Sequence, residues 1–421
     1  MAKAGDLVEI VTKDNVYHGI LMPKPEIFKS NSVVLKLDSG YNIGIDKKKI
    51  KKIKLIKKAK KTKQKKKKIK LNKKLPTVSI LSTGGTISSK VDYATGGTYA
   101  SLTAEDFVEL EPKILEFANI RAKKILQIMS EDVGYADWIT MAKEIKKELD
   151  KKEVAGVVLT HGTDTLHYTA SMLSFMFPKL SKPVVLVGAQ RSTDRGSSDT
   201  FMNLISSVIA ATQKIGEVMV CMHATSNDDF CYLHRATKVR KMHTSRRDAF
   251  RSINQFPIAK VFTNGMVEIL TDYKKPDEKT ELNTKIDKKV ALVYVYPGIN
   301  EKILDYYVKQ KYHGVVLMGT GLGHVPKKIV QKIKFMTRKN IVVCITSQCL
   351  YGRTHGFVYS NLRRLERAGA IFCEDMLPEV AYVKLMHVLG KTKKLEKVKE
   401  LMQENLKGEI NKTISVKMFM N

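Results

Sequence analysis

The sequence contains few cysteines, and they are scattered. Five occur in 421 residues, with no C-x-x-C pair among Cys221, Cys231, Cys344, Cys349 and Cys373. A disulfide framework or a zinc site needs recurrent, suitably spaced cysteines, so we expect neither, and we predict no metal site. Isolated thiols fit a reducing compartment, and the cytoplasm is the expected location.

Long apolar runs are also missing. No stretch approaches the roughly 20 residues that a membrane helix needs. The opening residues, MAKAGDLVEI, lack the apolar core of a secretory signal. Hydrophobic residues nevertheless make up 43% of the chain. A chain of 421 residues with that content predicts two or three globular domains and no membrane association.

One segment has no acidic residue at all. Residues 47–74 contain 18 lysines, and removing them from the net charge of +32 leaves +14. A basic surface attracts polyanions through counterion release, and nucleic acid is the usual one. A lysine run can equally be a solvated tether, and composition does not separate the two interpretations.

The N-terminal residues predict a succession of short strands. Turn residues separate the segments Gly5–Thr12, Tyr17–Met22, Ser32–Leu37 and Tyr41–Ile45. Short strands in so few residues bury their faces only by curling, so residues 1–56 predict a small all-β, SH3-like barrel. The first half of the lysine run could add a strand. Residues 57–75, where like charges repel, predict an extended linker.

From Pro76 onward, predicted strands alternate with predicted helices. The first block has strands at Thr77–Ser82, Ala122–Met129, Val154–Leu159, Pro183–Val187 and Glu217–Met222, and helices at Thr103–Asn119, Asp137–Leu149, Leu166–Phe177 and Phe201–Ala211. The second block has strands at Val290–Tyr296, Gly314–Met318, Ile341–Thr346 and Ala370–Phe372, and a helix at Pro378–Leu389. This alternation predicts an α/β fold with two domains of parallel sheets flanked by helices, at 76–272 and 290–421, joined by a linker at 273–289.

Two segments rich in threonine and glycine follow strands of the first block. They are Thr83-Gly84-Gly85-Thr86-Ile87 and His161-Gly162-Thr163-Asp164-Thr165. Ligands of such sheets bind outside the carboxyl ends of the strands, where these segments are expected to face each other. Glycine turns leave backbone N–H groups free to stabilise an oxyanion. Thr86 and Thr163 offer hydroxyl nucleophiles, and Asp164 could orient a base or bind a substrate ammonium.

A hydroxyl nucleophile needs a base. His161 adjoins the second segment, but it could equally be a satisfied, half-buried residue, and no Ser-His-Asp arrangement stands out. The segment 236–250, ATKVRKMHTSRRDAF, is strongly cationic and ends in an apolar, helix-like stretch. A lysine among other cations loses its proton more readily. The residues alone do not choose between Lys238 and Lys241, and the segment could instead be an anion-binding or solvated loop.

Taken in order, these residues resemble the L-asparaginase family. The segments at 83–87 and 160–165 match its paired signature, Ser130-Glu131-Asp132 its substrate-binding triplet, and Gly188-Ala189-Gln190-Arg191 one of its strand ends. Lys241 stands nine residues before Phe250, the spacing of the family's catalytic lysine. The resemblance covers residue 76 to about 400. It implies an asparaginase-like core, with a larger N-terminal and a smaller C-terminal domain, that hydrolyses an amide.

The resemblance also implies roles for residues. Thr86 matches the nucleophile of the first segment, while Thr163, Asp164 and Lys241 match a second triad in which the lysine accepts the hydroxyl proton. The charges of Lys238, Arg240, Arg246 and Arg247 would offset the stabilising effect of Asp164 on a charged lysine. The implied substrate-binding residues are Ser130, Glu131, Gly85, Gly162 and Ala189. The family places a tyrosine on the loop after the first segment, with which neither Tyr93 nor Tyr99 aligns cleanly.

The first 75 or so residues set the chain apart from free asparaginases. A barrel (GDLVEIVTKDNVYHGILMPK), a linker and this core together resemble the D-subunit family of archaeal-type glutamyl-tRNA(Gln) amidotransferases, as do Val239–Phe250 and Arg191–Arg195. The resemblance implies release of ammonia from glutamine or asparagine. It also implies a partner, the E subunit of the amidotransferase, that binds Glu-tRNA(Gln), uses ATP and Mg²⁺ and receives the ammonia. A heterodimer, or a dimer of heterodimers, is expected.

No cofactor is expected in this chain. The phosphate-binding pattern GxxxxGK[ST] does not occur, and GTGLG at 319–323 lacks the context of a nucleotide site. Two other functions stay open at this stage. One is a stand-alone L-asparaginase with an accessory barrel, and the other is a nucleic-acid-binding protein with a degenerate catalytic core.

Overall fold

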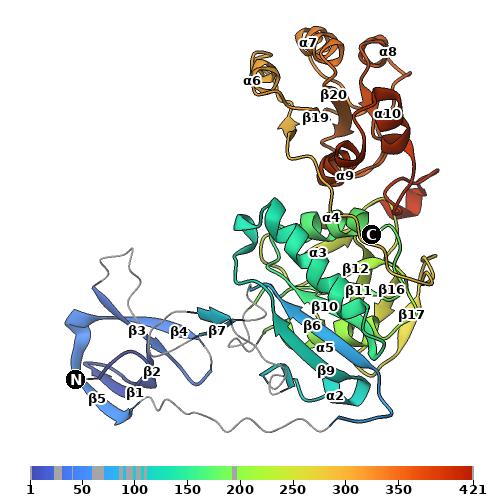
Figure 1. The fold of residues 1–421 in the computed structure, drawn as a ribbon. Helices are drawn as coiled ribbons and strands as arrows, with labels where there is room; N and C mark the ends of the chain where they lie inside the picture. Colours follow the sequence, from blue (N-terminus) through green and yellow to red (C-terminus); the bar gives the residue numbers. More distant parts are fainter. Residues whose placement is uncertain are drawn as a thin grey trace.

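The structure is a computed structural model that describes residues 2–22, 31–39, 41–58, 71–84, 89–91, 98–100, 106–108, 111–191 and 197–419, with backbone only at 89–91 and 98–100. Figure 1 shows a small N-terminal sheet beside a large α/β unit, with a second α/β unit beyond it. Within the described residues, no helix has both the length and the apolar character that crossing a membrane requires.

The N-terminal sheet has five antiparallel strands in the order β4-β3-β2-β1-β5. They are β1 (Leu7–Thr12), β2 (Val16–Leu21), β3 (Ser32–Lys36), β4 (Asn42–Asp46) and β5 (Ile50–Lys57). Ile45 of β4 shares a core with Val8 and Ile10 of β1, although two strands separate them, so the sheet curls over its buried face. The predicted small all-β unit is confirmed, and β5 is the extra strand from the lysine run. No ladder joins β4 to β5 in the described residues, so the sheet is curled but open.

The first α/β unit is built on eight strands in the order β17-β16-β13-β12-β11-β10-β6-β9. Five are parallel, namely β9 (Asn119–Lys124), β6 (Thr77–Ser82), β10 (Val154–Thr160), β11 (Val184–Val187) and β12 (Val218–His223). Every residue of β11 and β12 is buried, as expected when helices cover both faces of a parallel sheet. The covering helices are α2 (Ile114–Phe117), α3 (Tyr135–Leu149), α4 (Leu166–Met176) and α5 (Thr200–Ala211).

The rest of this unit differs from the sequence prediction. Three antiparallel strands extend the sheet, β13 (Cys231–Arg235), β16 (Ala259–Val261) and β17 (Val267–Ile269), so the sheet is mixed rather than parallel. The helix-like stretch at 236–250 is instead a hairpin of β14 (Val239–Lys241) and β15 (Phe250–Ser252). A second short hairpin pairs β7 (Ser89–Val91) with β8 (Thr98–Ala100).

The segment between the first two parallel strands also needs correction. In its described part, the predicted helix at 103–119 is helical only at 106–108 and in the four residues of α2. The strand predicted at 122–129 begins three residues earlier, at Asn119, and ends at Lys124. Asn119 sets this start, because its side-chain amide donates to the carbonyls of Asn72 and Leu75 while its own residue pairs with Thr77.

The second α/β unit has four parallel strands in sequential order. The strands are β18 (Val290–Tyr294), β19 (Gly314–Gly319), β20 (Val342–Ser347) and β21 (Ile371–Phe372), and the helices are α6 (Ile303–Lys309), α7 (Lys327–Arg338), α8 (Ser360–Arg367), α9 (Pro378–Lys391) and α10 (Leu395–Gln403). Short 3-10 turns occur at η1 (Lys47–Lys49), η3 (Ser130–Asp132) and η4 (Val416–Met418). The parallel sheet and α9 confirm the prediction, while α6, α7, α8 and α10 have no counterpart among the predicted helices.

The two α/β units meet through α4 and α9. Buried residues of α9 such as Val380 and Leu385 belong to the same continuous core as Leu166 and Leu173 of α4. Figure 1 shows these two helices where the green and red parts of the chain approach each other. The second unit is therefore packed directly behind the helix that follows the second threonine segment.

Candidate active site

The two threonine segments lie at one edge of the large sheet. Strands β6 and β10 are parallel neighbours, and their last residues, Ser82 and Thr160, are paired in register. Thr83 ties the segments together, because its backbone N–H and its hydroxyl both donate to the carbonyl of Thr160, at 3.3 and 2.9 Å. Gly84 has a φ of +110°, and a Cβ there would lie 2.7 Å from the carbonyl oxygen of Ile128. Glycine is therefore required at this turn.

The second segment forms the polar centre of the site. The Nζ atom of Lys241 lies 2.8 Å from Thr163 Oγ1 and 2.8 Å from Asp164 Oδ1. The lysine side chain is 9% exposed and the aspartate side chain 67%, so the cluster is closed behind and open toward solvent. A hydroxyl, an amine and a carboxylate thus converge from residues 78 and 77 positions apart in sequence. This set can carry out proton transfer from a hydroxyl nucleophile.

The hairpin β14–β15 delivers Lys241 to this position. Lys241 is the cross-strand partner of Phe250, which is fully buried, as is Val239 at the start of β14. The nine-residue spacing noted in the sequence is therefore the length of a hairpin whose ends are anchored in the core. Because Lys241 is the last residue of β14, its amine reaches the site while the loop that follows stays exposed to solvent.

Ser130 and Gly162 are in contact at the floor of the site. Ser130, in η3, is buried, and its carbonyl accepts a hydrogen bond of 2.5 Å from the Thr165 hydroxyl. A Cβ on Gly162 would lie 2.8 Å from Ser130 Cβ, so only glycine allows this approach. Glu131, next along the turn, is exposed to solvent. The structure thus places Ser130 against Gly162, the residue before Thr163, with Glu131 following Ser130 in the turn.

The turn after β11 forms another wall of the site, beside Thr163. A Cβ on Gly188 would lie 2.7 Å from Thr163 Cγ2, and the next residue, Ala189, is buried. Gln190 places its Oε1 atom 3.5 Å from the Thr163 hydroxyl. The backbone N–H groups of Gln190 and Arg191 both donate to the carboxylate of buried Asp199, which fixes the turn.

His161 supports the site but is unsuited to act as its base. Trp138 donates to the Thr169 hydroxyl at 2.9 Å, that hydroxyl lies 3.0 Å from His161 Nε2, and His161 Nδ1 lies 2.7 Å from the Gly162 carbonyl. Burial lowers the pKa of His161 to about 4, so the imidazole is neutral. With Nε2 accepting and Nδ1–H donating, the ring is fully engaged in holding the glycine turn.

The structure separates Lys238 from Lys241 and corrects one expectation. Lys238 is fully buried, with its Nζ atom 2.7 Å from Asp375 Oδ2, so it carries a structural ion pair. The other nearby cations also have carboxylates of their own: Arg240 with Glu379, Arg246 with Asp248 and Arg247 with Asp228. The bonds from Arg246 lower the pKa of Asp248 to about 2. The predicted like-charge offset by these four residues is therefore largely neutralised by pairing.

Several predicted features lie outside the described residues. They are Gly85, Thr86, the loop residue Tyr93, residues 192–195 of the Arg191–Arg195 segment and most of the linker, 59–70. Tyr99 belongs to β8, of which only the backbone is described.

The sequence interpretation misses the residues behind Lys241. Asp375 and Glu379, from the second unit, hold Lys238 and Arg240. A signal is available in the sequence for Arg240 but not for the turn residue Lys238, because Arg240 and Lys241 are successive residues of a strand and successive residues face opposite sides. Their carboxylate partners, more than 130 positions away, have no local signal.

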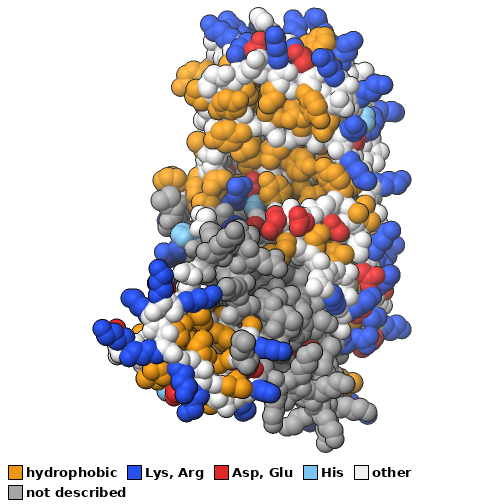
Figure 2. Space-filling view, turned by 90° about the vertical axis from the view of Figure 1, so that its left-hand side faces the viewer, with side chains coloured by type: hydrophobic (Ala, Val, Ile, Leu, Met, Phe, Trp, Pro, Cys, Tyr) orange, Lys and Arg blue, Asp and Glu red, His pale blue; other side chains and the backbone are white. Residues whose placement is uncertain are grey.

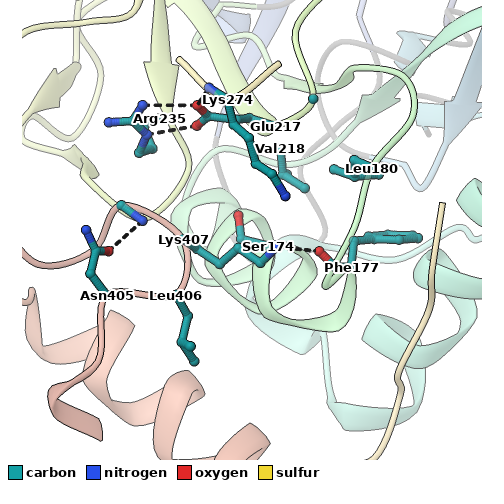
Figure 3. Close-up of a pocket in the computed structure, with 12 residues that line it drawn as sticks. Ser174, Phe177, Leu180, Glu217, Val218, Arg235, Lys274, Asn405, Leu406 and Lys407 are labelled. Atoms are coloured by element: carbon teal, nitrogen blue, oxygen red, sulfur yellow. Dashed lines mark hydrogen bonds and ion pairs between the residues drawn. The ribbon is translucent and has the colours of Figure 1, made fainter. Parts of the chain in front are cut away.

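A separate cavity of about 250 Å³ lies at the other end of α4, lined by Ser174, Glu217, Arg235 and Lys407 among others (Figure 3). Its charged groups bind each other or the backbone. Arg235 forms a two-pronged pair with Glu217, and Lys407 Nζ donates to the carbonyls of Phe177 and Pro178. Burial lowers the pKa of Lys407 to about 8. Since α4 runs roughly 15 Å between the two ends, at about 1.5 Å per residue, this cavity is distinct from the Thr163 site.

No candidate metal site occurs in the described parts of the chain. Across 2–84, 106–191 and 197–419, apart from the undescribed gaps, no group of three or more His, Cys, Asp or Glu side chains could hold an ion.

Comparison with known proteins agrees with this geometry. Three family descriptions match in succession: "GatD N-terminal domain" at residues 2–56, "Asparaginase, N-terminal" at 77–275 and "Glutaminase/Asparaginase C-terminal domain" at 289–402. Among solved structures, the thermostable L-asparaginase of Thermococcus kodakarensis is 30% identical with a TM-score of 0.73, covering 80% of this chain and 100% of its own. L-asparaginase I of Vibrio cholerae is 29% identical, with a TM-score of 0.70 and coverage of 80% and 99%.

Curated relatives extend the match over the N-terminal sheet as well. The D subunit of the glutamyl-tRNA(Gln) amidotransferase of Pyrococcus abyssi is 50% identical over 414 residues, which are 96% of this chain and 94% of that protein. The D subunit of the same enzyme from Methanococcus maripaludis strain C6 is 46% identical over 419 residues, covering 98% and 99%. With an asparaginase-like site behind an N-terminal sheet, and with identity of this level over almost the whole length, the chain belongs to the D-subunit family of glutamyl-tRNA(Gln) amidotransferases.

Proposed function

We propose that this chain is the ammonia-generating subunit of a Glu-tRNA(Gln) amidotransferase. The observation that carries the proposal is the convergence of Thr163, Asp164 and Lys241 at 2.8 Å in a chain of this family. The substrate is the side-chain amide of glutamine or asparagine. The released ammonia serves to convert Glu-tRNA(Gln) to Gln-tRNA(Gln).

The geometry supports acyl transfer through a threonine. In its neutral form, Lys241 accepts the Thr163 proton as the hydroxyl oxygen attacks the amide carbon, and Asp164 stabilises the resulting ammonium. Collapse of the tetrahedral intermediate, with the proton returned from Lys241 to the departing nitrogen, expels ammonia and leaves an ester on the threonine, which water then hydrolyses to the acid and the free hydroxyl. Thr86, the first-segment nucleophile by resemblance, is required as well. An acylated peptide trapped from a slow substrate, and identified by mass spectrometry, tells which of the two hydroxyls forms the ester.

Substrate recognition is assigned to the surroundings of these groups. Ser130 lies against Gly162, the residue before Thr163, Glu131 follows Ser130, Ala189 follows Gly188 in the turn beside Thr163, and Gly85 belongs to the first segment; we assign these five residues to substrate binding. Glu131 is exposed and acidic, so we assign it the α-ammonium of the amino-acid substrate. Backbone N–H groups of the glycine turns are assigned to the oxyanion.

The remaining chemistry is assigned to a partner. Activation of the glutamate on tRNA needs ATP and Mg²⁺, and this sequence carries no GxxxxGK[ST] pattern. We therefore propose a complex with the E subunit of the amidotransferase, as a heterodimer or a dimer of heterodimers, in which the partner binds the tRNA and ATP.

A coupled enzyme must avoid releasing ammonia without an acceptor. We therefore expect amide hydrolysis to stay low until charged tRNA is bound to the complex. The experiment times ammonia release from glutamine and from asparagine by this chain alone, with its partner, and with both partner and Glu-tRNA(Gln). The rate should rise at the last addition, and Gln-tRNA(Gln) should form only with ATP. Rapid hydrolysis by the chain alone, unchanged by either addition, would instead identify a stand-alone asparaginase.

A further inference from the structure

The strand that carries Lys241 and the turn residue just before it are each attached to the second α/β unit. Lys238 Nζ lies 2.7 Å from Asp375 Oδ2, and Arg240 Nη1 lies 2.6 Å from Glu379 Oε2. Asp375 follows β21 and Glu379 is the second residue of α9, so the two carboxylates bracket the start of that helix. Both cations belong to the first unit, and both carboxylates belong to the second.

Strand geometry turns these two contacts into a constraint on the site. Side chains of a strand alternate, so Arg240 projects to one side of β14 and Val239 and Lys241 to the other, while Lys238 stands in the turn just before the strand. The first side faces the second unit. The other side packs Val239 into the core and directs Lys241 at Thr163. The position of the lysine amine is therefore coupled, through one short strand, to the position of α9.

Each attachment is rigid. Lys238 and Asp375 are both fully buried, and Asn411 donates to Asp375 through its backbone N–H and its side-chain amide, each at 2.9 Å. Glu379 is 1% exposed, while Arg240 reaches solvent at 30%. Ion pairs in such surroundings hold their geometry because neither carboxylate can turn to water.

The partner of Glu379 is Arg240 rather than a histidine. His167 Nε2 lies 3.8 Å from Glu379 Oε1, which is too long for a hydrogen bond, and neither ring nitrogen of His167 has a partner among the described residues. Burial, with the charges of Arg240 and Lys241, lowers the pKa of His167 to about 3, so this ring is neutral. Glu379 therefore pairs with Arg240, which is the residue next to Lys241 in the chain.

We propose that Asp375 and Glu379 are positioning residues for amide hydrolysis, which hold β14 from the second unit so that Lys241 meets Thr163. This inference rests on the proposed role of Lys241 as the base. The carboxylates themselves lie behind the strand and touch neither Thr163 nor the substrate. Displacing the lysine by about 1 Å is enough to cost on the order of 10²-fold in rate.

The test compares Glu379→Ala with Tyr382→Phe in the full chain. Tyr382 is a matched control because it also bridges the units from α9, but its hydroxyl lies 3.2 Å from that of Tyr135 in α3 instead of pairing with a residue of β14. With L-asparagine as substrate, Glu379→Ala should lower kcat by about 10- to 100-fold and change KM by less than about threefold. Asp375→Asn, assayed below its melting temperature, should act in the same direction. Tyr382→Phe should keep kcat within about twofold.

Two further measurements make the result decisive. Arg240→Ala should lower kcat like Glu379→Ala, and the double variant should be no worse than either, because both act through one contact. The rate at which an amine-reactive reagent modifies Lys241, measured by peptide mass spectrometry, should rise in Glu379→Ala and stay unchanged in Tyr382→Phe. The labelling result does not depend on hydrolysis. If the unsubstituted chain and complex release no ammonia, the proposed function fails while the positioning inference is still tested. Equal losses in Glu379→Ala and Tyr382→Phe, or additive losses in the double variant, would overturn the inference.

Discussion

At the scale of single residues, the site depends on an amine held between a hydroxyl and a carboxylate. Replacing Lys241 by Met, or Thr163 by Val, keeps most of the volume and removes the proton acceptor or the nucleophile. We expect each to lower kcat/KM for amide hydrolysis by at least about 10²-fold, without unfolding the chain. We expect Asp164→Asn and Thr86→Ala to lower kcat/KM to a similar extent.

The control for these substitutions is Lys182→Met. Lys182 donates to the carbonyls of Leu149 and Lys151 at the far end of α3, so its loss should leave kcat/KM within about threefold. The rate of ammonia release from asparagine measures the loss of activity in each variant and in the control, and melting temperatures show whether the chain stays folded. A Lys241→Met variant that retains more than a tenth of the activity would show that another group is the base.

A second residue-scale prediction changes no polar group. Gly188→Ala adds a Cβ that would lie 2.7 Å from Thr163 Cγ2 and 2.8 Å from the His161 carbonyl oxygen. The threonine has to move, so we expect kcat to fall by about 10-fold or more through misplacement alone. Gly44→Ala is the control, since its Cβ would meet nothing closer than 3.8 Å. Unchanged kcat in Gly188→Ala would mean that the hydroxyl position is not critical.

The site can be predicted from the sequence only as far as local signals reach. Glycine and threonine at strand ends locate Thr163 and Asp164, because parallel strands end at one edge. The choice between Lys238 and Lys241 needs family resemblance, since both stand in the same cationic segment. The structure separates them because Lys238 stands in the turn before β14 and is paired with the Asp375 carboxylate, which is 137 positions away and invisible in any local pattern.

At the scale of elements, the parallel strands are the easiest to predict. Val184–Val187 and Val218–His223 are buried throughout and form continuous apolar runs in the sequence. The strands β16 and β17 have three residues each and mix apolar with charged residues, so no periodicity identifies them. The strands of the hairpin β14–β15 have three residues each and include arginine and lysine, so their sequence shows no strand periodicity either.

One element-scale prediction concerns the packing of β10 against α5. A Cβ on Gly156 would lie 2.1 Å from the carbonyl oxygen of Ala211, the last residue of α5. Backbone cannot yield as a flexible side chain does, so Gly156→Ala should destabilise the unit by about 1–3 kcal/mol. Gly134→Ala, whose Cβ would meet only an Asp137 oxygen at 3.7 Å, should cost far less. Denaturant titrations of both variants give the comparison, and equal stabilities would contradict this account.

At the scale of the whole molecule, positive charge dominates. On the face drawn in Figure 2, Lys and Arg side chains line much of the outline, while Asp and Glu form smaller groups. Replacing the lysines of residues 57–70 by Ser and Gly should leave hydrolysis of free amide within about twofold, because the described site draws on other segments. It should weaken binding of tRNA to the complex and flatten the dependence of log K on log salt, which follows the number of phosphates neutralised.

A Lys→Arg version of the same segment is the matched control. It keeps the charge and should keep the salt slope. Binding measured at several salt concentrations separates the variants. An unchanged slope after removal of the lysines would indicate that this run is a tether only.

The stability of the folded molecule should fall in acid, because several histidines are buried. Burial lowers the pKa of His161 to about 4 and the pKa values of His167, His234 and His387 to about 3. In the unfolded chain a histidine titrates near 6.5. Below about pH 6.5 the unfolded state therefore binds protons that the folded state does not, and stability falls as the pH drops toward 4 and below.

Each such histidine steepens the fall by up to about 1.4 kcal/mol per pH unit. His387→Phe removes one of them conservatively, because His387 already stacks on Phe175 with ring centroids 6.1 Å apart. Between pH 6 and 4 the unfolding free energy of this variant should fall less steeply than that of the unsubstituted chain, by about that amount, while the two nearly coincide at pH 8. Exposed His355 gives the control, since His355→Gln leaves an already solvated site solvated and should keep the original slope. Urea titrations at pH 8, 6, 5 and 4 measure the slopes, and identical slopes for His387→Phe and the unsubstituted chain would show that this histidine takes up its proton without unfolding.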